Sequence, residues 1–240
     1  MRWRDMPGPS AKRHGFALYT VIIPVKSGLG AKSRLHGNPI LRRALARAFA
    51  LDTVAAAKRA RMVGRIVIVT NGRAAADFRH LGCHIVHEKT SANDDSLNAA
   101  IAQGRDWAAR RHPYEPVVVL PADLPALTPE VFDDVLIVAQ QHDLAFCADA
   151  NTTGTTVLTA ADPRALSTAY GDFSAEAHRA LGAVQLDRVD SRARQDIDTM
   201  ADLGDAYRLG LGPATSAVLR RFSLDPSAEA LAAADVSSSS

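Results

Sequence analysis

Aromatic residues, cysteines, net charge and long apolar runs are all scarce in this chain. Phe, Trp and Tyr make up 5% of its 240 residues while hydrophobic residues reach 47%, so a packed core must rest on Ala, Val, Leu and Ile. The net charge of +2 gives no strong field for nucleic acid or a membrane surface. Cys83 and Cys147 form no Cys-x-x-Cys pattern, which predicts reduced thiols and a cytoplasmic location.

The length of the chain is sufficient for one sizeable α/β domain with its own core. No apolar run approaches the roughly 20 residues of a membrane helix. We expect a mobile leader at 1–17, a single domain at 18–222 and a disordered tail at 223–240. The basic leader is followed by no apolar stretch, so we do not expect a signal peptide.

Short apolar runs alternate with helical patterns along the middle of the chain. Strands are expected at 20–25, 65–70, 84–87, 116–120, 144–147 and 155–159. Helices are expected to begin near 38, 73 and 129 and to lie near 95–110, 174–181 and 199–209. The strand runs lack polar alternation, which is typical of strands buried on both faces. This order predicts a three-layer α/β fold with a mostly parallel central sheet, which binds ligands beyond the carboxyl ends of its strands.

A glycine-rich basic segment at 26–34 follows the first expected strand. Lys26, Lys32 and Arg34 would neutralise a polyphosphate, and Gly28 would let the backbone approach it closely. The segment is not a Walker A loop, because alanine stands before Lys32, and it lacks the third glycine of a dinucleotide fingerprint. The alternative to phosphate binding is a solvated basic loop.

Acidic residues follow the most apolar expected strand and precede the last expected helix. Asp123 comes directly after strand 116–120, where a carboxylate can hold Mg²⁺ against a phosphate; the alternative is a turn-forming aspartate. Asp196 and Asp198 lie in an extended segment. We expect one of them to share the metal with Asp123 and the other to be available as the cap of the following helix.

Small polar residues mark three further segments. Thr155 lies in a threonine-rich stretch, and Gly171 precedes a helix that starts near Ser174. A glycine at such a place can present N–H groups to an anion, although Ser174 could equally be only the helix N-cap. Asn98, in the first turn of another expected helix, could read a base edge or act as a cap.

Taken in order, these segments resemble the phosphoenolpyruvate or 2-phospho-L-lactate guanylyltransferase family of coenzyme F420 biosynthesis. The resemblance covers roughly residues 18–220. The segments that carry it are Val25–Leu35 (VKSGLGAKSRL), Asp95–Ile101 (DSLNAAI), Pro121–Leu127 (PADLPAL), Gly154–Leu158 (GTTVL), Tyr170–Ser174 (YGDFS) and Asp196–Thr199 (DIDT). Each motif alone is weak, whereas the ordered set is specific.

The resemblance implies a Rossmann-like nucleotidyltransferase fold of the GT-A-like kind. It also implies transfer of GMP from GTP to the phosphate of a small phospho-carboxylate, with release of pyrophosphate and with Mg²⁺ as cofactor. By this resemblance, GTP phosphates would be bound by Lys26, Lys32 and Arg34, the nucleotide would also contact Gly28, Leu97 and Asn98, and catalysis would involve Lys26, Lys32 and Asp123. The metal would be bound by Asp123 with Asp196 or Asp198. Phosphoenolpyruvate would be bound by Thr155, Gly171 and Ser174.

The sequence leaves some alternatives open. The acceptor could be phosphoenolpyruvate, 2-phospho-L-lactate or 3-phosphoglycerate. Ser174 is followed by Ala-Glu-Ala-His178, where the family has an Arg-His pair, and this departure would bring an acid, Glu176, near an anionic acceptor. The rival functions are a molybdenum-cofactor or sugar-phosphate type of nucleotidyltransferase with the same fold and a non-catalytic nucleotide-binding protein. The expected partners are small molecules rather than nucleic acid or membrane, and a homodimer is a possible assembly.

Overall fold

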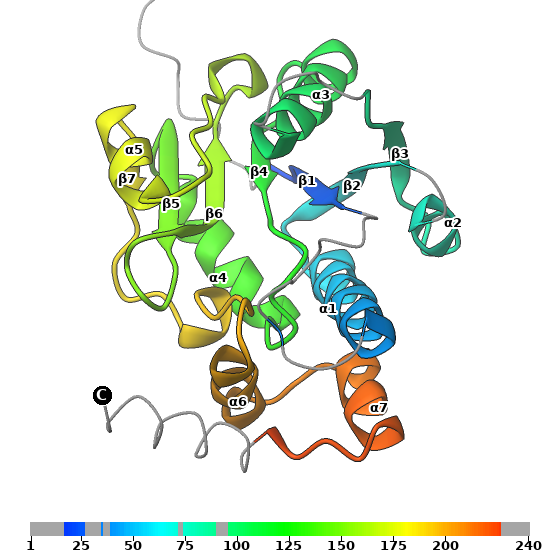
Figure 1. Ribbon diagram of the computed structural model, residues 1–240. Coiled ribbons are helices and arrows are strands. Elements are labelled where there is room, and N and C mark those ends of the chain that lie inside the picture. The colour runs from blue at the N-terminus through cyan, green and yellow to red at the C-terminus, as the bar shows by residue number, and fades with distance from the viewer. Residues whose placement is uncertain (1–16, 27–34, 36–38, 72–73, 90–95, 227–240) are drawn as a thin grey trace, which may run out of the picture.

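A single seven-stranded sheet forms the centre of the molecule in the computed structural model (Figure 1). The structure describes residues 17–26, 35, 39–71, 74–89 and 96–226, so the expected leader and tail lie almost wholly outside the described residues. The strands are β1 (Tyr19–Val25), β2 (Val63–Thr70), β3 (His84–His87), β4 (Val117–Val119), β5 (Leu144–Ala148), β6 (Thr155–Ala160) and β7 (Val184–Gln185).

Helices cover both faces of the sheet. They are α1 (Pro39–Arg59), α2 (Ala74–Arg79), α3 (Ser96–Arg111), α4 (Pro129–Ala139), α5 (Ser174–Ala180), α6 (Met200–Leu209) and α7 (Pro213–Arg221), with 3₁₀ turns at Pro163–Ala165 and Ser191–Ala193. The expected strands and helices are all present, with bounds that shift by a few residues, whereas β7 and α7 were not expected. No helix in the described ranges is long and apolar enough to cross a membrane.

The strand order is β3-β2-β1-β4-β6-β5-β7. Neighbouring strands are parallel except at β6, which runs antiparallel to both β4 and β5. The predicted mostly parallel sheet is therefore confirmed. Because β6 is reversed, its first residue lies at the same edge of the sheet as the carboxyl ends of β1, β4 and β5, and this edge carries the candidate site.

Successive residues of the central strands pack against different helical layers. Val21 and Ile23 of β1 belong to a core shared with α1 and α4, whereas Ile22 belongs to a core shared with α3 and α5. All three side chains are fully buried, and each such burial contributes about 1.5–3 kcal/mol. The expectation of strands buried on both faces and of three layers is confirmed (Figure 1).

Helix α3 packs unusually close to the sheet at Gly104. A Cβ atom at this position would lie 2.5 Å from Ile22 Cγ2 and 3.0 Å from Val69 Cγ2. Because glycine has no side chain, α3 can pack directly against β1 and β2. This close packing sets the distance between the first turn of α3 and the carboxyl edge of the sheet.

Helix α7 depends on a buried acid from the middle of α1. Asp52 is only 5% exposed, and its carboxylate accepts hydrogen bonds from the N–H groups of Ala214 at 2.9 Å and Thr215 at 2.7 Å. These N–H groups belong to the first turn of α7, where they have no partner within the helix. A Cβ at Gly212 would come within 2.3 Å of the Asp52 carboxylate carbon, so the chain needs glycine where it passes this acid.

We predict that Asp52→Ala lowers the free energy of unfolding by about 2–3 kcal/mol, because it removes a cap and leaves two N–H groups without their charged acceptor. Urea denaturation followed by circular dichroism measures the loss. Asp205→Ala is the matched control, because Asp205 is an exposed acid paired with Arg208 on α6, where such pairs contribute a few tenths of a kcal/mol. Equal losses in the two variants would contradict the capping role.

Candidate functional site

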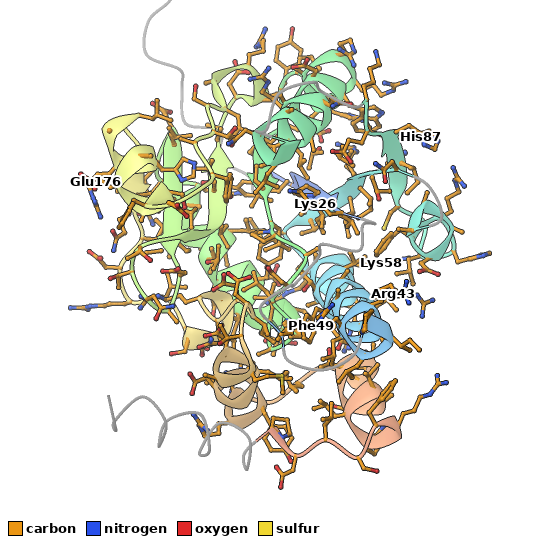
Figure 2. All side chains as sticks on the ribbon, in the orientation of Figure 1. Lys26, Arg43, Phe49, Lys58, His87 and Glu176 are labelled. Atoms are coloured by element: carbon orange, nitrogen blue, oxygen red, sulfur yellow. The ribbon has the colours of Figure 1, made fainter. Side chains whose placement is uncertain are left out.

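A cavity of about 350 Å³ opens at the carboxyl ends of β1 and β4. The residues that define it are Lys26 after β1, Phe49 on α1, Leu97 on α3, Asp123 after β4, Tyr170 and Asp198. Four of these are residues that the sequence singled out, and they come from segments far apart in the chain. Figure 2 shows Lys26 near the centre of the molecule, above Phe49 of α1.

The loop that carries Asp123 is held by hydrogen bonds from three other segments. The N–H of Leu124 donates to Thr53 Oγ1 on α1 at 3.0 Å. The Asp123 carbonyl accepts from the N–H of Ile197 at 3.2 Å, and the Pro125 carbonyl accepts from Gly212 at 2.8 Å. Asp123 therefore sits on a fixed turn rather than on a loose loop.

Asp196 and Asp198 flank Ile197, which is fully buried beside Asp123. The side chain of Asp198 lines the cavity. The expectation that one of these two acids caps the following helix is wrong. Thr199 is the cap of α6: its hydroxyl accepts from the N–H of Asp202 at 3.2 Å, and the Asp202 carboxylate accepts from the N–H of Thr199 at 2.7 Å. Thr199 forms this capping box because its hydroxyl stands three residues before an acid.

The donor set at this end of the cavity fits a hard cation such as Mg²⁺. Asp123 and Asp198 reach the same space and offer carboxylate oxygens. Within the described residues no three His, Cys, Asp or Glu side chains gather closely enough to hold a metal by themselves. Mg²⁺ commonly binds one or two carboxylates and takes its other ligands from substrate phosphates and water, so two acids beside a nucleotide pocket suit it.

Lys26 stands at the mouth of the cavity, exposed, one residue beyond β1. The end of β1 is fixed because the Thr70 hydroxyl donates to the Val25 carbonyl at 2.7 Å. The other predicted phosphate-binding residues, Gly28, Lys32 and Arg34, lie outside the described residues.

Thr155 begins β6 and pairs in register with Ala148, beside the Asp123 loop. Its hydroxyl lies 2.9 Å from Nδ1 of His178. The other ring nitrogen, Nε2, accepts a hydrogen bond from the N–H of Ala169 at 3.0 Å. In the neutral ring the proton must then be on Nδ1, which donates to Thr155 and leaves the Thr155 O–H directed to another acceptor.

His178 is held neutral by its surroundings. The residue is fully buried, and burial lowers the pKa of its imidazole to about 4. Its ring packs edge-on against Tyr170, with centroids 4.9 Å apart. At neutral pH His178 thus donates a hydrogen bond to Thr155 from a fixed position. The sequence did not reveal this role, because it shows His178 only as one residue of an expected helix.

The turn at 171–174 brings Gly171 and Ser174 close to Thr155. Gly171 has a φ of +148° and Phe173 has the left-handed φ of +57°. The N–H of Ser174 donates to Gly171 O at 3.2 Å, and the N–H of Ala175 donates to Thr153 O at 3.0 Å. Phe173 occupies the N-cap position of α5 without a side-chain cap, so the alternative of Ser174 as the N-cap is wrong; Ser174 is the first helical residue and is buried.

Glu176 does not face the candidate site. It is exposed on α5, and Figure 2 shows it on the outer side of that helix, pointing away from Lys26. Helical spacing buries Ser174, Ala175 and His178 and leaves Glu176 on the opposite side. The expectation that Glu176 lies near the anionic acceptor is therefore wrong.

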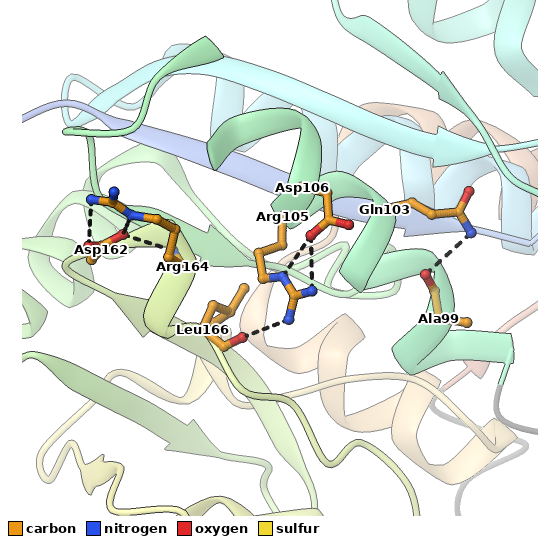
Figure 3. Close-up of polar contacts among 7 residues, drawn as sticks. All are labelled: Ala99, Gln103, Arg105, Asp106, Asp162, Arg164 and Leu166. Carbon is orange, nitrogen blue, oxygen red and sulfur yellow. Dashed lines mark hydrogen bonds and ion pairs between the residues drawn. The ribbon is translucent and has the colours of Figure 1, made fainter. Parts of the chain in front are cut away.

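Helix α3 holds the segment that leads into this turn at two points. The Arg105 guanidinium donates to the Leu166 carbonyl at 3.4 Å while it pairs with Asp106 (Figure 3). Further along, Asn98 Nδ2 donates to Tyr170 O at 2.8 Å, and the N–H of Tyr170 donates to Asn98 Oδ1 at 3.0 Å. Both ends of the Asn98 amide thus contact the backbone of Tyr170, a positioning role that adds to the predicted nucleotide contact.

The chain matches the family described as "Guanylyl transferase CofC like" over residues 19–238. A protein named phosphoenolpyruvate guanylyltransferase from Streptomyces coelicolor is 44% identical, and one of the same name from Streptomyces scabiei is 45% identical. Each match covers 85% of this chain and 97% of the relative.

Solved structures share the fold at lower identity. A Desulfovibrio desulfuricans protein assigned as a nucleotide-diphospho-sugar transferase has a TM-score of 0.62 with 18% identity, over 85% of this chain and 94% of that one. A 4-diphosphocytidyl-2C-methyl-D-erythritol synthase has a TM-score of 0.54 with 15% identity, over 80% and 96%. These likenesses bear on the fold alone, and they confirm the expected nucleotidyltransferase architecture.

We predict that His178 makes the protein less stable as the pH falls from about 6.5 to about 4. In the unfolded chain the imidazole binds a proton near pH 6.5, whereas in the folded protein it does so only near pH 4, so protonation favours unfolding across this window. The shift corresponds to a loss on the order of 3 kcal/mol.

Urea denaturation of the wild type and of His178→Gln at pH 7.5 and pH 4.5 measures this contribution. The variant lacks the imidazole and should lose less stability between the two pH values than the wild type does. His80→Gln, at an exposed histidine, is the control and should follow the wild type. An equal fall in the wild type and in His178→Gln would contradict the prediction.

Proposed function

The chain belongs to the family of CofC-like guanylyl transferases, and we propose that it joins GMP from GTP to the phosphate of phosphoenolpyruvate in coenzyme F420 biosynthesis. The observation that carries this proposal is the arrangement at one edge of the sheet. Lys26, Asp123 and Asp198 line one cavity, and Tyr170, which directly precedes Gly171 of the expected acceptor site, lines it as well. The nucleotidyltransferase class follows from the family, while the acceptor is inferred from the names of relatives.

The nucleotide would occupy the cavity between α1 and α3. Phe49 and Leu97 supply apolar walls, on which the nucleoside part of GTP would pack. Lys26, together with Lys32 and Arg34, would bind the phosphates and stabilise the negative charge of the departing pyrophosphate. Gly28 and Asn98 complete the proposed nucleotide contacts.

Asp123 and Asp198 are the residues that would hold Mg²⁺, with Asp196 as the neighbouring alternative. The bound cation would neutralise the charge of two phosphates that must approach each other. The protein contributes the fixed position of the Asp123 turn, which Thr53, Ile197 and Gly212 hold by hydrogen bonds. Preorganisation of this kind avoids moving the carboxylate at the moment of reaction.

The acceptor would lie where Thr155, Gly171 and Ser174 come together. Thr155 can donate its hydroxyl hydrogen, because His178 already supplies the hydrogen bond that the Thr155 oxygen accepts. A phosphate oxygen of the acceptor would attack the α-phosphorus of GTP in line, forming one P–O bond while the bond to pyrophosphate breaks. That oxygen is ionised near neutral pH, so the site needs positioning and charge neutralisation rather than a strong base.

A cytoplasmic setting is part of this proposal. The two cysteines, Cys83 and Cys147, are free thiols, and burial raises the pKa of Cys147 to about 12, which keeps it protonated. Reduced, unreactive thiols agree with a reducing compartment. GTP and a phospho-carboxylate are the proposed small-molecule partners.

We predict that Asp123→Asn lowers the rate of pyrophosphate release by at least about 100-fold, because the variant loses a charged metal ligand that acts on the transition state. The assay contains GTP, phosphoenolpyruvate and Mg²⁺. The Asp123 turn is held by its backbone, so the circular dichroism spectrum of the variant should match that of the wild type. Asp205→Asn, far from the cavity on α6, is the control, and near-normal turnover in Asp123→Asn would rule out the metal role.

We predict that GTP is the preferred donor when four nucleoside triphosphates are tested against phosphoenolpyruvate, 2-phospho-L-lactate and 3-phosphoglycerate. Phosphoenolpyruvate should give the fastest pyrophosphate release, although a small apolar difference between acceptors changes kcat/KM by only about 10–200-fold. A preference for ATP or CTP as the donor would contradict the assignment of the protein as a guanylyltransferase. Calorimetric binding of GTP without pyrophosphate release from any combination would favour a non-catalytic binding protein.

A further inference from the structure

The side chain of Tyr170 lines the cavity, yet the roles proposed above give it no task. Its hydroxyl oxygen is shielded from solvent and, within the part of the chain that the structure describes, makes no hydrogen bond. A buried hydroxyl in this state costs about 1–3 kcal/mol. Buried polar groups in native proteins are nearly always paired, so an exception beside a binding cavity points to a partner that arrives with a ligand.

The position of Tyr170 is fixed from several sides. Its backbone N–H and C=O both bond to the amide of Asn98 on α3. Its ring packs against His178 at a centroid distance of 4.9 Å and an angle of 72°, and His178 is itself held by Ala169 and Thr155. With backbone and ring both held, the hydroxyl of this cavity-lining residue has no hydrogen-bond partner among the described residues.

The electrostatic surroundings make this hydroxyl a donor. Burial is the main cause that raises the pKa of Tyr170 far above its usual range, and the negative charge of Asp123 adds to it. The group therefore keeps its proton throughout the working pH range of an enzyme. A neutral O–H that is shielded from solvent is well suited to an anionic oxygen, because a hydrogen bond to a charged partner is stronger than one to a neutral partner.

The chain places Tyr170 between the two halves of the site. On one side lies Asp123, and on the other side the ring contacts His178, which supports Thr155. Gly171 follows Tyr170 directly and belongs to the proposed acceptor site. A group at this junction meets the end of the acceptor that must reach the nucleotide, and that end is the phosphate.

We propose that the Tyr170 hydroxyl donates a hydrogen bond to a phosphate oxygen of the acceptor and so orients that phosphate toward the α-phosphorus of GTP. This inference rests on the proposed function, because it presupposes a phosphorylated acceptor. It adds a specificity-determining residue that needs no change of protonation. It also explains why the protein tolerates a buried hydroxyl without a partner when no ligand is bound.

Tyr170→Phe tests the proposal, because it removes only the hydroxyl. The kcat/KM for phosphoenolpyruvate should fall about 10-fold or more, through a higher KM for that acceptor, while the KM for GTP stays within about 2-fold of the wild type. The melting temperature of the ligand-free variant should equal that of the wild type or exceed it by about 2–4 °C, because a buried unpaired group has been removed. Tyr114→Phe, at a side chain that is 75% exposed, is the matched control and should change neither quantity.

The outcomes separate this proposal from the proposed function. If the wild type releases no pyrophosphate with phosphoenolpyruvate, the proposed function is refuted. The Tyr170 proposal is then tested by a binding measurement: phosphoenolpyruvate and Mg²⁺ are added, and the resulting increase in melting temperature is compared between the wild type and the variant. That increase should be smaller in Tyr170→Phe. Three results would each overturn the Tyr170 assignment. Tyr170→Phe could be active with unchanged kinetics, it could show a raised KM for GTP rather than for phosphoenolpyruvate, or its melting temperature without ligand could be lower than that of the wild type.

Discussion

Two adjacent polar residues buried in the middle of α1 are the constraint on which the carboxyl edge of this protein depends. Asp52 accepts hydrogen bonds from two N–H groups in the first turn of α7, and Thr53 accepts one from the N–H of Leu124, in the turn that carries Asp123, the proposed metal ligand. A buried carboxylate is tolerated only when hydrogen bonds replace its lost hydration. The same two residues therefore fix the last helix and the central acid relative to one helix.

The links extend from this pair across the whole site. Gly212, which passes the Asp52 carboxylate, also donates to Pro125 in the Asp123 turn. On the other side, Arg194 donates to the carbonyls of Ala148 and Asp149, so the segment before Ile197 is fastened to the end of β5. Hydrogen bonds thus connect the turn that carries Asp123 with the first turn of α7, and they connect the segment before Ile197 with the end of β5.

Much of this architecture could be predicted from the sequence, because the central strands are continuous β-branched runs. β2 and β3 appear where those runs stand, and the acids and the lysine that follow strands converge at one edge because parallel strands share that edge. β7 could not be predicted, since two residues are too short for a pattern. α7 was missed although Gly212 and Pro213 mark its start, and the acid that receives its first-turn N–H groups, Asp52, lies 162 residues away from Ala214, where no local pattern reveals it.

Within the candidate site, prediction failed where a residue acts through a partner distant in sequence. Tyr170 and His178 carry no spacing that reveals their contact, and Thr53 looked like any other helical residue. The residue that caps α6 was also predicted wrongly. Asp198 was a plausible helix cap, but Thr199, one residue later, forms the capping box. Lys26 and Asp123 could be placed at the cavity from the sequence, because each stands directly after a strand, and Asp198 could be named because an acidic segment precedes the last expected helix.

Asp52 and the first turn of α7 are far apart in the sequence, and this separation affects how the protein folds during synthesis. While the ribosome is making the first half of the chain, the Asp52 carboxylate has none of the α7 N–H groups that surround it in the finished fold, because those groups lie 162 and 163 residues further on. Contacts of such separation close late and slowly. The turn that carries Asp123 is therefore completed only when the last helix emerges, so a nascent or truncated chain should not hold Asp123, the proposed metal ligand, in place.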